Sequence, residues 1–439
     1  MYLLLTFIIL RAALAVAATC DSITISSEDD ANTIQGCRTV TGDVVLSTDI
    51  TDAISLEGVE EIAGNLKASG SPITSLSAPK LRSIGRDLAL HGLAEATDIS
   101  FPQLNEIGGV FDLDSLPSLT ALNISVLTSV ESFHLGSMAN LTKMELQHLY
   151  NVTGANPTVN ISSVGLESVS GFNETSRLKS FTLQNAPNLK LLPIRTAEID
   201  TLFINGSGVL TVDFFVGNMG PKFIGVLNIT GCANFFPFPD ATTVNALNLY
   251  QNTFSDLELE LLEVKDSIRI MDNPNLDHVL FPNSDLVRSV IYGPPTGSKA
   301  PQWKELVIAG NPKLDSDQLD FADTDWGFWY WGARNLSTLI MTGSSLHNKF
   351  FDPDDTTGQR LPETNHTYTT AEFRVSTDAI GFNCSFLDSL RSKGLFQGSY
   401  SCQGNTIPAG PVPGTAMSRV MSVGILLGSA FIAASFVAI

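Results

Sequence analysis

The sequence predicts an all-β chain that folds as a right-handed parallel β-solenoid, with coils of about 22–23 residues and disulfide-bonded ends. Three observations predict this fold. Apolar residues repeat in two interleaved series, proline and leucine mark the corners of the repeat, and cysteines lie near both ends of the chain. A β-sandwich also has short strands at regular intervals, but it does not explain one period shared by two interleaved series.

The first series is an apolar-x-x-apolar unit followed by a short alternating segment. Steps of 22, 23 and 23 residues separate its first members, which are Val59, Leu81, Leu104 and Leu127. The second series runs about half a period out of phase and consists of Leu76, Ile99, Leu122 and Met144. Because alternation places one face of a strand in the core, we expect two short strands in each coil. Stacked coils then bury an apolar stripe that no single coil could bury alone.

A Pro-x-Leu motif marks the corners of the repeat. Its prolines are Pro79, Pro102, Pro117, Pro187, Pro274 and Pro312. Proline lacks the N–H that a central strand needs, so we expect it just past a strand end, with the leucine returning to the core. In the later half the unit looks like a leucine-rich repeat, as in Val244-x-x-Leu247-x-Leu249-x-x-Asn252. Asparagine at such a corner can bond the backbone of neighbouring coils.

Both ends of the chain are apolar. Residues 1–18 are predicted to be a signal peptide, because the apolar run ends in small residues just before Cys20. Residues 420–439 carry no charge, and a polar spacer over 403–419 precedes them. This order resembles a glycosylphosphatidylinositol (GPI) attachment signal, with Gly404 or Asn405 as the expected attachment site. A retained transmembrane helix is the alternative that the length of the tail allows.

The five cysteines divide into two local pairs and one single residue. Pairing of Cys20 with Cys37 and of Cys384 with Cys402 is the simplest connectivity. These pairs lie where the open ends of a solenoid need protection, so we assign the solenoid to 19–350 and a C-terminal cap region to 351–402. Cys232 is expected to be a buried, unreactive thiol.

Ten N-x-S/T sequons accompany the predicted signal peptide, which together indicate a secreted glycoprotein. They are Asn123, Asn140, Asn151, Asn160, Asn173, Asn205, Asn228, Asn335, Asn365 and Asn383. The chain has 25 Lys+Arg against 45 Asp+Glu, a net charge of −20. Such an acidic balance argues against nucleic acid and anionic lipid as partners, since both attract basic surfaces.

The chain resembles the fungal GPI-anchored cell-wall-organisation proteins, whose repeats resemble receptor L domains. The resemblance rests on the Cys20–Cys37 pair leading into Gly42-Asp43-Val44, the rungs between Ile62 and Leu135, the Asn273-Pro274-Asn275-Leu276 and Asn311-Pro312-Lys313-Leu314 motifs, and the C-terminal tail. It implies a non-enzymatic protein of the cell surface that is needed for wall integrity, with sporulation-linked relatives. The Ser/Thr-rich stalk that usually precedes the anchor in this family is nearly absent here.

Catalysis is the rival class of function, because pectin-degrading enzymes share the parallel β-helix shape. Hydrolysis of a glycosidic bond needs converging carboxylates, and those enzymes carry an Asn-Thr-Asp motif before a His-Gly motif. Here His91-Gly92 occurs without the earlier motif, so we predict no enzyme activity, no cofactor and no metal. The aspartates at 315, 317, 320, 323 and 325 could hold calcium but lack the spacing of an EF-hand, and we interpret them as a solvated loop.

An aromatic run follows these aspartates. Trp326, Trp329, Tyr330 and Trp331 either pack in the core or a cap, which we favour, or form with Trp303 a platform for a glycan. No sequon lies between Cys232 and Arg334, so a partner has access to this stretch. The sequence therefore predicts a protein that binds or spaces wall polysaccharide or wall proteins and reaches the membrane through a GPI lipid. A receptor-like module for a protein or small ligand is the alternative, and a glycan hydrolase is the third.

Overall fold

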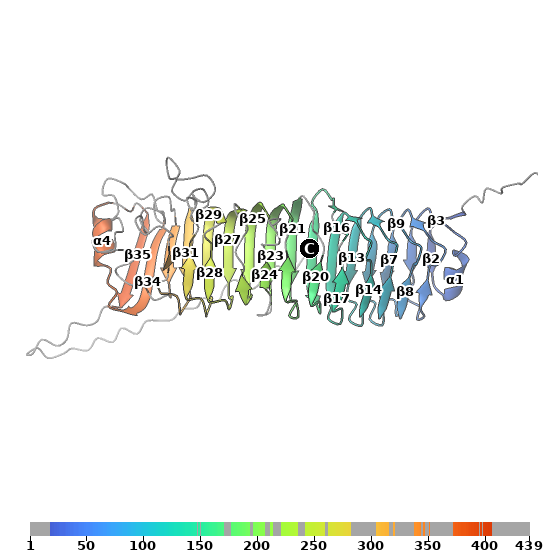
Figure 1. Ribbon diagram of the computed structural model, residues 1–439, viewed down its shortest axis with the longest axis horizontal. Coiled ribbons are helices and arrows are strands. Elements are labelled where there is room, and N and C mark those ends of the chain that lie inside the picture. The colour runs from blue at the N-terminus through green and yellow to red at the C-terminus, as the bar shows by residue number, and fades with distance from the viewer. Residues whose placement is uncertain are drawn as a thin grey trace, which may run out of the picture.

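The structure of the protein is a computed structural model, which describes part of the 439-residue chain. The described residues are 18–146, 148–149, 151–170, 177–193, 196–206, 211–213, 221–235, 242–259, 262–281, 304–315, 319–320, 338–343, 346, 351, 372–394, 396 and 398–405. They form a rod of stacked coils, with residues 18–46 at one end of the rod and residues 372–405 at the other (Figure 1). The predicted parallel β-solenoid is confirmed.

One long sheet runs along the whole rod, and each coil adds a strand that is parallel to its neighbours. Within the described residues it has 16 strands. In order they are β2 (Ile23–Ile25), β4 (Val44–Leu46), β7 (Leu66–Ser69), β10 (Leu88–His91), β13 (Val110–Asp114), β16 (Ser132–Met138), β19 (Thr158–Val164), β21 (Arg177–Gln184), β23 (Glu198–Asn205), β25 (Phe223–Thr230), β27 (Thr242–Tyr250), β29 (Leu262–Met271), β31 (Glu305–Ala309), β33 (Thr338–Thr342), β34 (Glu372–Ile380) and β35 (Ser399–Asn405).

A first side sheet is present in the N-terminal part of the rod. Its strands are β1 (Thr19–Cys20), β3 (Thr39–Val40), β6 (Glu61–Ile62), β9 (Ser83–Ile84), β12 (Glu106–Ile107), β15 (Ser129–Val130) and β18 (Asn151–Val152). Strands β6, β9, β12 and β15 each include the last residue of an apolar-x-x-apolar unit, to which the sequence analysis assigned no strand. The expectation of two strands in each coil is therefore wrong for this part, where the coils have three strands.

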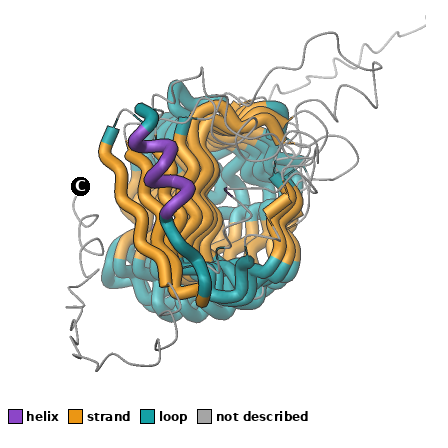
Figure 2. Tube along the Cα trace, turned by 90° about the vertical axis from the view of Figure 1, so that its left-hand side faces the viewer, coloured by secondary structure: helices purple, strands orange, loops and turns teal. Residues whose placement is uncertain are grey.

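The remaining face consists of three short sheets that follow one another along the rod. Their strands are β5 (Ile54–Ser55), β8 (Ser75–Ser77), β11 (Asp98–Ser100) and β14 (Ala121–Asn123), then β17 (Lys143–Glu145), β20 (Ser168–Ser170), β22 (Leu191–Pro193), β24 (Thr211–Asp213) and β26 (Asn234–Phe235), and finally β28 (Asp256–Glu258), β30 (His278–Leu280) and β32 (Leu319–Asp320). Seen from the C-terminal end, the strands of the long sheet stack behind one another on one side of the core (Figure 2).

The core is a set of apolar columns parallel to the axis of the rod. Register pairs Leu88 with Phe111, Phe111 with Phe133 and Phe133 with Val159, and all four side chains are fully buried. The rings of Phe111 and Phe133 stack with centroids 4.7 Å apart. Among the described residues, Val126 is the large apolar side chain left exposed, at 37%. The period of the sequence thus places like residues above one another, and stacking removes them from water.

Most long-sheet strands of the described chain have, at or just after their end, one residue in the left-handed region of the backbone. Glycine fills this place in several coils, as at Gly310 with a φ of 65°. Six other coils place a serine, asparagine, glutamine or aspartate there, with φ between 50° and 61°: Ser115, Ser137, Ser163, Asn185, Gln251 and Asp272. The backbone N–H at these corners bonds the next coil, as from Gln251 to the carbonyl of Met271 at 3.2 Å.

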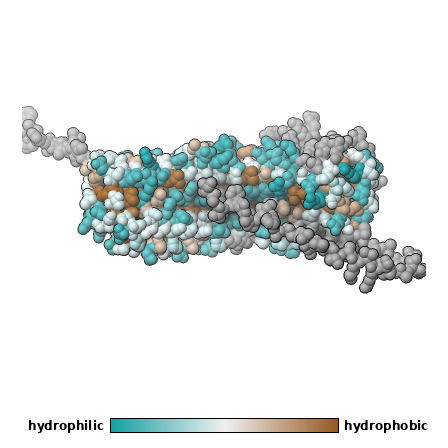
Figure 3. All heavy atoms as spheres, turned by 180° about the vertical axis from the view of Figure 1, so that it is seen from behind, coloured by the Kyte–Doolittle hydropathy of each residue, from teal (hydrophilic) through white to brown (hydrophobic). Residues whose placement is uncertain are grey.

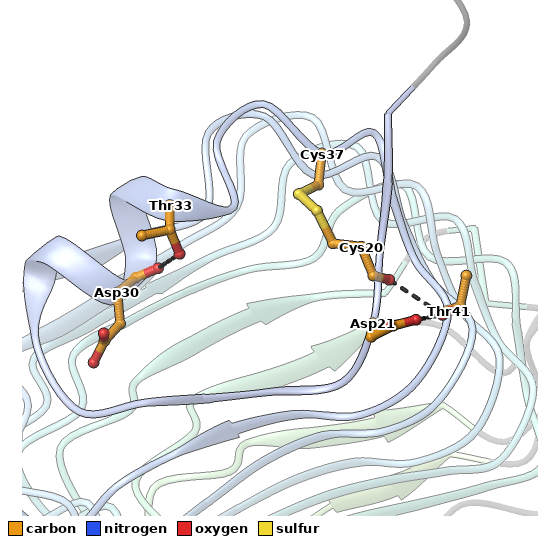
Figure 4. The surroundings of a disulfide bond; sticks show 6 residues. All are labelled: Cys20, Asp21, Asp30, Thr33, Cys37 and Thr41. Carbon is orange, nitrogen blue, oxygen red and sulfur yellow. Dashed lines mark hydrogen bonds between the residues drawn. A yellow bond between two sulfur atoms is a disulfide. The ribbon is translucent and has the colours of Figure 1, made fainter.

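The N-terminal end is closed by a helix and a disulfide. Helix α1 (Glu28–Thr33) begins at Ser27, whose hydroxyl accepts a hydrogen bond from the Asp30 backbone N–H at 3.2 Å. The disulfide joins Cys20 to Cys37 next to this helix (Figure 4). On the other side of the disulfide, the Thr41 hydroxyl donates to the Cys20 carbonyl at 3.2 Å. The predicted pairing at this end is confirmed.

The C-terminal end is closed in the same manner. Helix α4 (Ser385–Ser392) buries Leu387 and Leu390 and lies across the end of the coils (Figure 2). The second predicted disulfide joins Cys384 to Cys402, with the two Cα atoms 5.9 Å apart. Strand β35 continues to Asn405, so residues 403–405 of the predicted spacer belong to the long sheet. Within the described residues, no helix has the length and apolar character needed to cross a membrane.

Candidate functional site: ladders, sequons and a polar groove on the rod

Seven of the ten predicted glycosylation residues lie in the described part of the chain, and Asn173, Asn335 and Asn365 lie outside it. Asn123 in β14 and Asn151 in β18 are exposed, as the prediction of glycans on the outer face requires. Asn140 is also exposed, and its amide donates to the Pro117 carbonyl of the preceding coil at 2.8 Å. Asn383 lies at the C-terminal end, where its side chain accepts from the Ser385 backbone N–H at 3.1 Å.

Three further sequons lie on the long sheet. Asn160 is in β19, Asn205 ends β23 and Asn228 is in β25, and each is partly exposed on the outer face. The carbonyl oxygen of the Asn228 side chain accepts from the Asn248 amide at 2.7 Å, which leaves the Asn228 nitrogen, the atom that a glycan would use, outside this bond. Glycans at these positions would cover the middle of the long sheet.

The two residues predicted for lipid attachment are in the last described strand. Asn405 pairs with Ile380 of β34, and Gly404 packs so closely that a Cβ there would lie 2.4 Å from the Phe382 carbonyl oxygen. The rest of the spacer and the tail at 420–439 lie outside the described residues. An anchor at Gly404 or Asn405 would hold the C-terminal end of the rod directly against the membrane.

The predicted aromatic contact residues Trp303, Trp326, Trp329, Tyr330 and Trp331 lie outside the described residues. The acidic cluster is described only at positions 315 and 320. Within the part of the chain that the structure describes, no three His, Cys, Asp or Glu side chains gather where they could hold a metal ion.

A polar ladder joins successive coils at the corners before strands β4, β7, β10 and β13. The Asp43 carboxylate accepts from both the backbone and the side-chain N–H of Asn65, each at 2.8 Å. Asn65 in turn accepts from the Asp87 backbone at 3.1 Å, and Asp87 accepts from the Val110 backbone at 3.0 Å. The two bonds from Asn65 lower the pKa of Asp43, because they stabilise the ionised form.

A second ladder lies in the C-terminal part, at the corner after the long-sheet strand. Asn252, Asn273 and Asn311 are completely buried. Asn273 accepts from the backbone and side chain of Asn252 at 2.9 and 3.1 Å, and Asn311 accepts from the same two groups of Asn273 at 3.0 Å each. Their amides also donate to the carbonyls of Ile229, Leu249 and Ile270. The expected role of corner asparagines as bridges between coils is confirmed.

Cys232 stands at the head of this second ladder, where its backbone N–H donates to the Asn252 side chain at 2.9 Å. It is fully buried, as predicted, and burial raises the pKa of its thiol to about 12. The sequence analysis missed its place in the ladder, although a leucine-rich repeat accepts asparagine or cysteine at this position. The Leu227-x-Ile229-x-x-Cys232 spacing was the available signal.

A groove of about 510 Å³ lies beside the second ladder. Nine residues from four successive coils line it: Ala233, Asn234, Thr253, Phe254, Ser255, Asp256, Asn275, Asp277 and Lys313. The Lys313 ammonium donates to the Asn275 side chain at 3.0 Å, and the Asn275 amide donates to the Thr253 carbonyl at 3.2 Å. The Ser255 hydroxyl donates to Asp256 at 2.7 Å. Sequence analysis missed this groove, because its residues are ordinary corner residues until the coils stack.

The surface around these features is mostly polar. Figure 3 shows the rod from behind, with hydrophilic and intermediate residues over most of the described surface and a broken row of hydrophobic residues along the axis. The described molecule is thus a rod-shaped parallel β-solenoid that is closed by disulfides at both described ends and joined internally by polar ladders.

Comparison with known proteins finds relatives of this chain among fungal surface proteins. No protein-family model matches the chain, and no solved structure matches it. The chain is 30% identical over 187 residues to protein ecm33 of Aspergillus fumigatus, which covers 41% of the chain and 42% of that protein. It is 26% identical over 327 residues to a cell surface GPI-anchored protein of Arthroderma benhamiae, covering 70% of the chain and 79% of that protein. It is 25% identical over 286 residues to cell wall protein ecm33 of Schizosaccharomyces pombe, covering 62% and 59%.

The chain is therefore a homologue of fungal GPI-anchored cell-surface and cell-wall proteins, and the resemblance found in its sequence is confirmed. Two of these relatives are named for the cell surface with a GPI anchor and for the cell wall, respectively. The matched segment spans 42% of the first relative's length and 79% of the second's.

Proposed function

We propose that the chain is a non-catalytic glycoprotein of the fungal cell surface, held there by a GPI lipid, that contributes to wall organisation by binding or spacing wall polymers. The observation that carries this proposal is the homology to proteins named for the cell wall and for a GPI anchor. The rod adds a physical argument. A stiff solenoid with a regular polar surface presents equivalent groups at intervals of about 4.8 Å, which suits a polymer better than a compact ligand.

The proposed anchor has its support in the tail at 420–439 and in the end of β35. Attachment at Gly404 or Asn405 would place the lipid directly after the disulfide-closed end of the rod. The sequons on several faces, including the long sheet, would place glycans along the middle of the rod and leave the groove region without one. Because glycans would cover the middle coils and not the groove, this arrangement favours a spacing role for the middle coils and a binding role for the coils near the groove.

Release of the protein from intact cells tests the anchor. A phosphatidylinositol-specific phospholipase should release it into the medium, and a variant that lacks residues 420–439 should be secreted without the enzyme. A protein attached covalently to the wall would not be released by the phospholipase but would be released by a glucanase. That result would still place the protein at the cell surface. Recovery of the tail peptide from the mature protein would overturn the proposed lipid anchor, because a GPI signal is removed on attachment.

A further inference from the structure

We propose that the groove beside the second ladder is a binding site for a neutral oligosaccharide, in which successive sugar rings lie against successive coils. The inference rests on the proposed function and makes it specific, because it names the class of polymer and the residues that hold it. The groove has about 510 Å³, the size of a small-molecule site.

The lining of the groove contains both hydrogen-bond donors and acceptors. The Lys313 ammonium supplies donors, the Asp256 and Asp277 carboxylates supply acceptors, and the Asn275 amide supplies both. Hydroxyl groups of a sugar donate and accept in the same way. Because the groove holds both signs of charge, it matches neither a polyanion nor a polycation, and a neutral polyhydroxyl chain fits it best.

The spacing of the groove fits a polymer that runs along the rod. Asn234, Ser255, Asp277 and Lys313 come from four successive coils, and neighbouring strands of a sheet are about 4.8 Å apart. A hexopyranose ring with its glycosidic link advances by a similar length. One sugar ring per coil would therefore meet at least one polar side chain at each step.

The floor of the groove is rigid. Thr253, Asn275 and Lys313 each lie within two residues of a buried ladder asparagine, whose side chain is bonded to the neighbouring coil. Pro274 and Pro312 fix the backbone between ladder and groove. Asn275 is itself held from both sides, by Thr253 and by Lys313. A preorganised lining lowers the entropic cost of binding. The Asp277 carboxylate is exposed, the described residues show no bonded partner for it, and it can therefore bind the ligand.

Glycosylation leaves this region accessible. The chain has no sequon between Cys232 and Arg334, so the described lining residues carry no glycan. The Asn228 sequon belongs to the first of the four groove coils, where it is on the outer face of the long sheet, whereas the groove follows the end of that strand.

Titration calorimetry with a β-1,3-linked glucose hexamer tests the proposal on the secreted full-length glycoprotein. The wild type should bind, and Asp277→Ala and Lys313→Ala should each raise the Kd about tenfold, the loss of about one hydrogen bond to the ligand. Glu106→Ala, which removes an exposed carboxylate in β12 on a distant coil, is the matched control and should leave the Kd unchanged. Raising salt from low to high concentration should leave the Kd of the wild type within about twofold, since the ligand is neutral.

Several outcomes overturn the inference. Equal binding by the wild type and both groove variants would place the saccharide elsewhere. Binding of a glucosamine hexamer, a polycation, that is abolished by salt would show that the surface recognises charge and not a neutral chain. If the wild type fails to bind the hexamer but still sediments with isolated walls, the groove is not the site and the proposed function stands. If it binds neither, both proposals fail. Unchanged thermal unfolding midpoints of the variants show that any loss of binding is not a loss of fold.

Discussion

The N-terminal and C-terminal parts of the rod join their stacked coils with different residues. Before Val152 the coils have three strands, and three residues separate Ile84 of the first side sheet from Leu88 of the long sheet. After Arg177 only two residues separate the corresponding apolar residues Val244 and Leu247, and both lie in one strand. The long-sheet strands grow accordingly, from 4 residues in β10 to 9 in β27.

The ladders of the two parts differ in chemistry as well as in place. Asp43 and Asp87 are partly exposed, so a carboxylate can remain ionised there and accept strong hydrogen bonds. Asn252, Asn273 and Asn311 are fully buried, where a charge would be costly and a neutral amide can both donate and accept. The buried rung of the first ladder, Asn65, is an asparagine as well, so in both ladders the buried rungs are neutral amides.

The largest expected effect comes from breaking the buried ladder. Asn273→Ala leaves the Asn252 backbone N–H and the Leu249 carbonyl buried without these partners, and each such group costs about 1–3 kcal/mol. We expect the surrounding coils to lose about 3–4 kcal/mol of stability. Asn65→Ala in the more exposed ladder should cost about 1 kcal/mol, since water can replace one bond. Native-state hydrogen exchange measures both, and equal losses would contradict the role given to burial.

The disulfides are expected to protect the two ends and not the middle of the rod. Cys384→Ser with Cys402→Ser should destabilise the C-terminal coils by about 3 kcal/mol, the value expected for a loop of this length. Because each coil contacts only its neighbours, the loss should stay local. Limited proteolysis should then cut near α4 and β35 first and spare the N-terminal coils. In the double variant of Cys20 and Cys37, the protease should cut the N-terminal coils first and spare the C-terminal coils. Simultaneous cleavage at both ends in either variant would contradict this prediction.

The corner residues give a smaller effect that has opposite signs in two coils. Gly310→Ala places a side chain at a φ of 65°, and its Cβ would lie 2.1 Å from an Asp272 carboxylate oxygen, so it should cost at least about 1–2 kcal/mol. Gln251→Gly relieves a non-glycine residue at a φ of 50° and should stabilise the fold by up to about 1 kcal/mol. Thermal unfolding midpoints should move down and up, respectively. A lower midpoint for Gln251→Gly would show that its side chain contributes more than the strain costs.

Acid is expected to cause the smallest difference in stability between the two ladders. The pKa of Asp43 is lowered by bonds from Asn65, and that of Asp200 by Lys179 and Arg177. A lowered pKa contributes stability that is present above the ordinary value of about 4 and is lost as the pH falls through the folded value. Hydrogen exchange should therefore rise on acidification to pH 3 in the coils around Asp43 and Asp200, and less in the coils of the buried asparagine ladder. The Asp43→Asn variant should lack this acid dependence, and an unchanged dependence would assign it to other carboxylates.

The sequence predicted much of this molecule, because stacking turns a period into columns. The two apolar series, the Pro-x-Leu corners and both disulfides could be predicted from spacing alone. The first side sheet could not, since its strands are two residues long and exist only by pairing with neighbouring coils. The groove was missed for a similar reason, because Ser255, Asn275 and Lys313 meet only when their coils stack.

Sedimentation with isolated fungal cell walls tests the central claim most directly. The purified glycoprotein should pellet with insoluble wall glucan, and the supernatant should gain no reducing sugar during the incubation. A protein that stays in the supernatant with both glucan and chitin would contradict a role in binding wall polymers. Release of reducing sugar by the wild type, but not by a denatured sample, would contradict the non-catalytic account and make the rod a hydrolase.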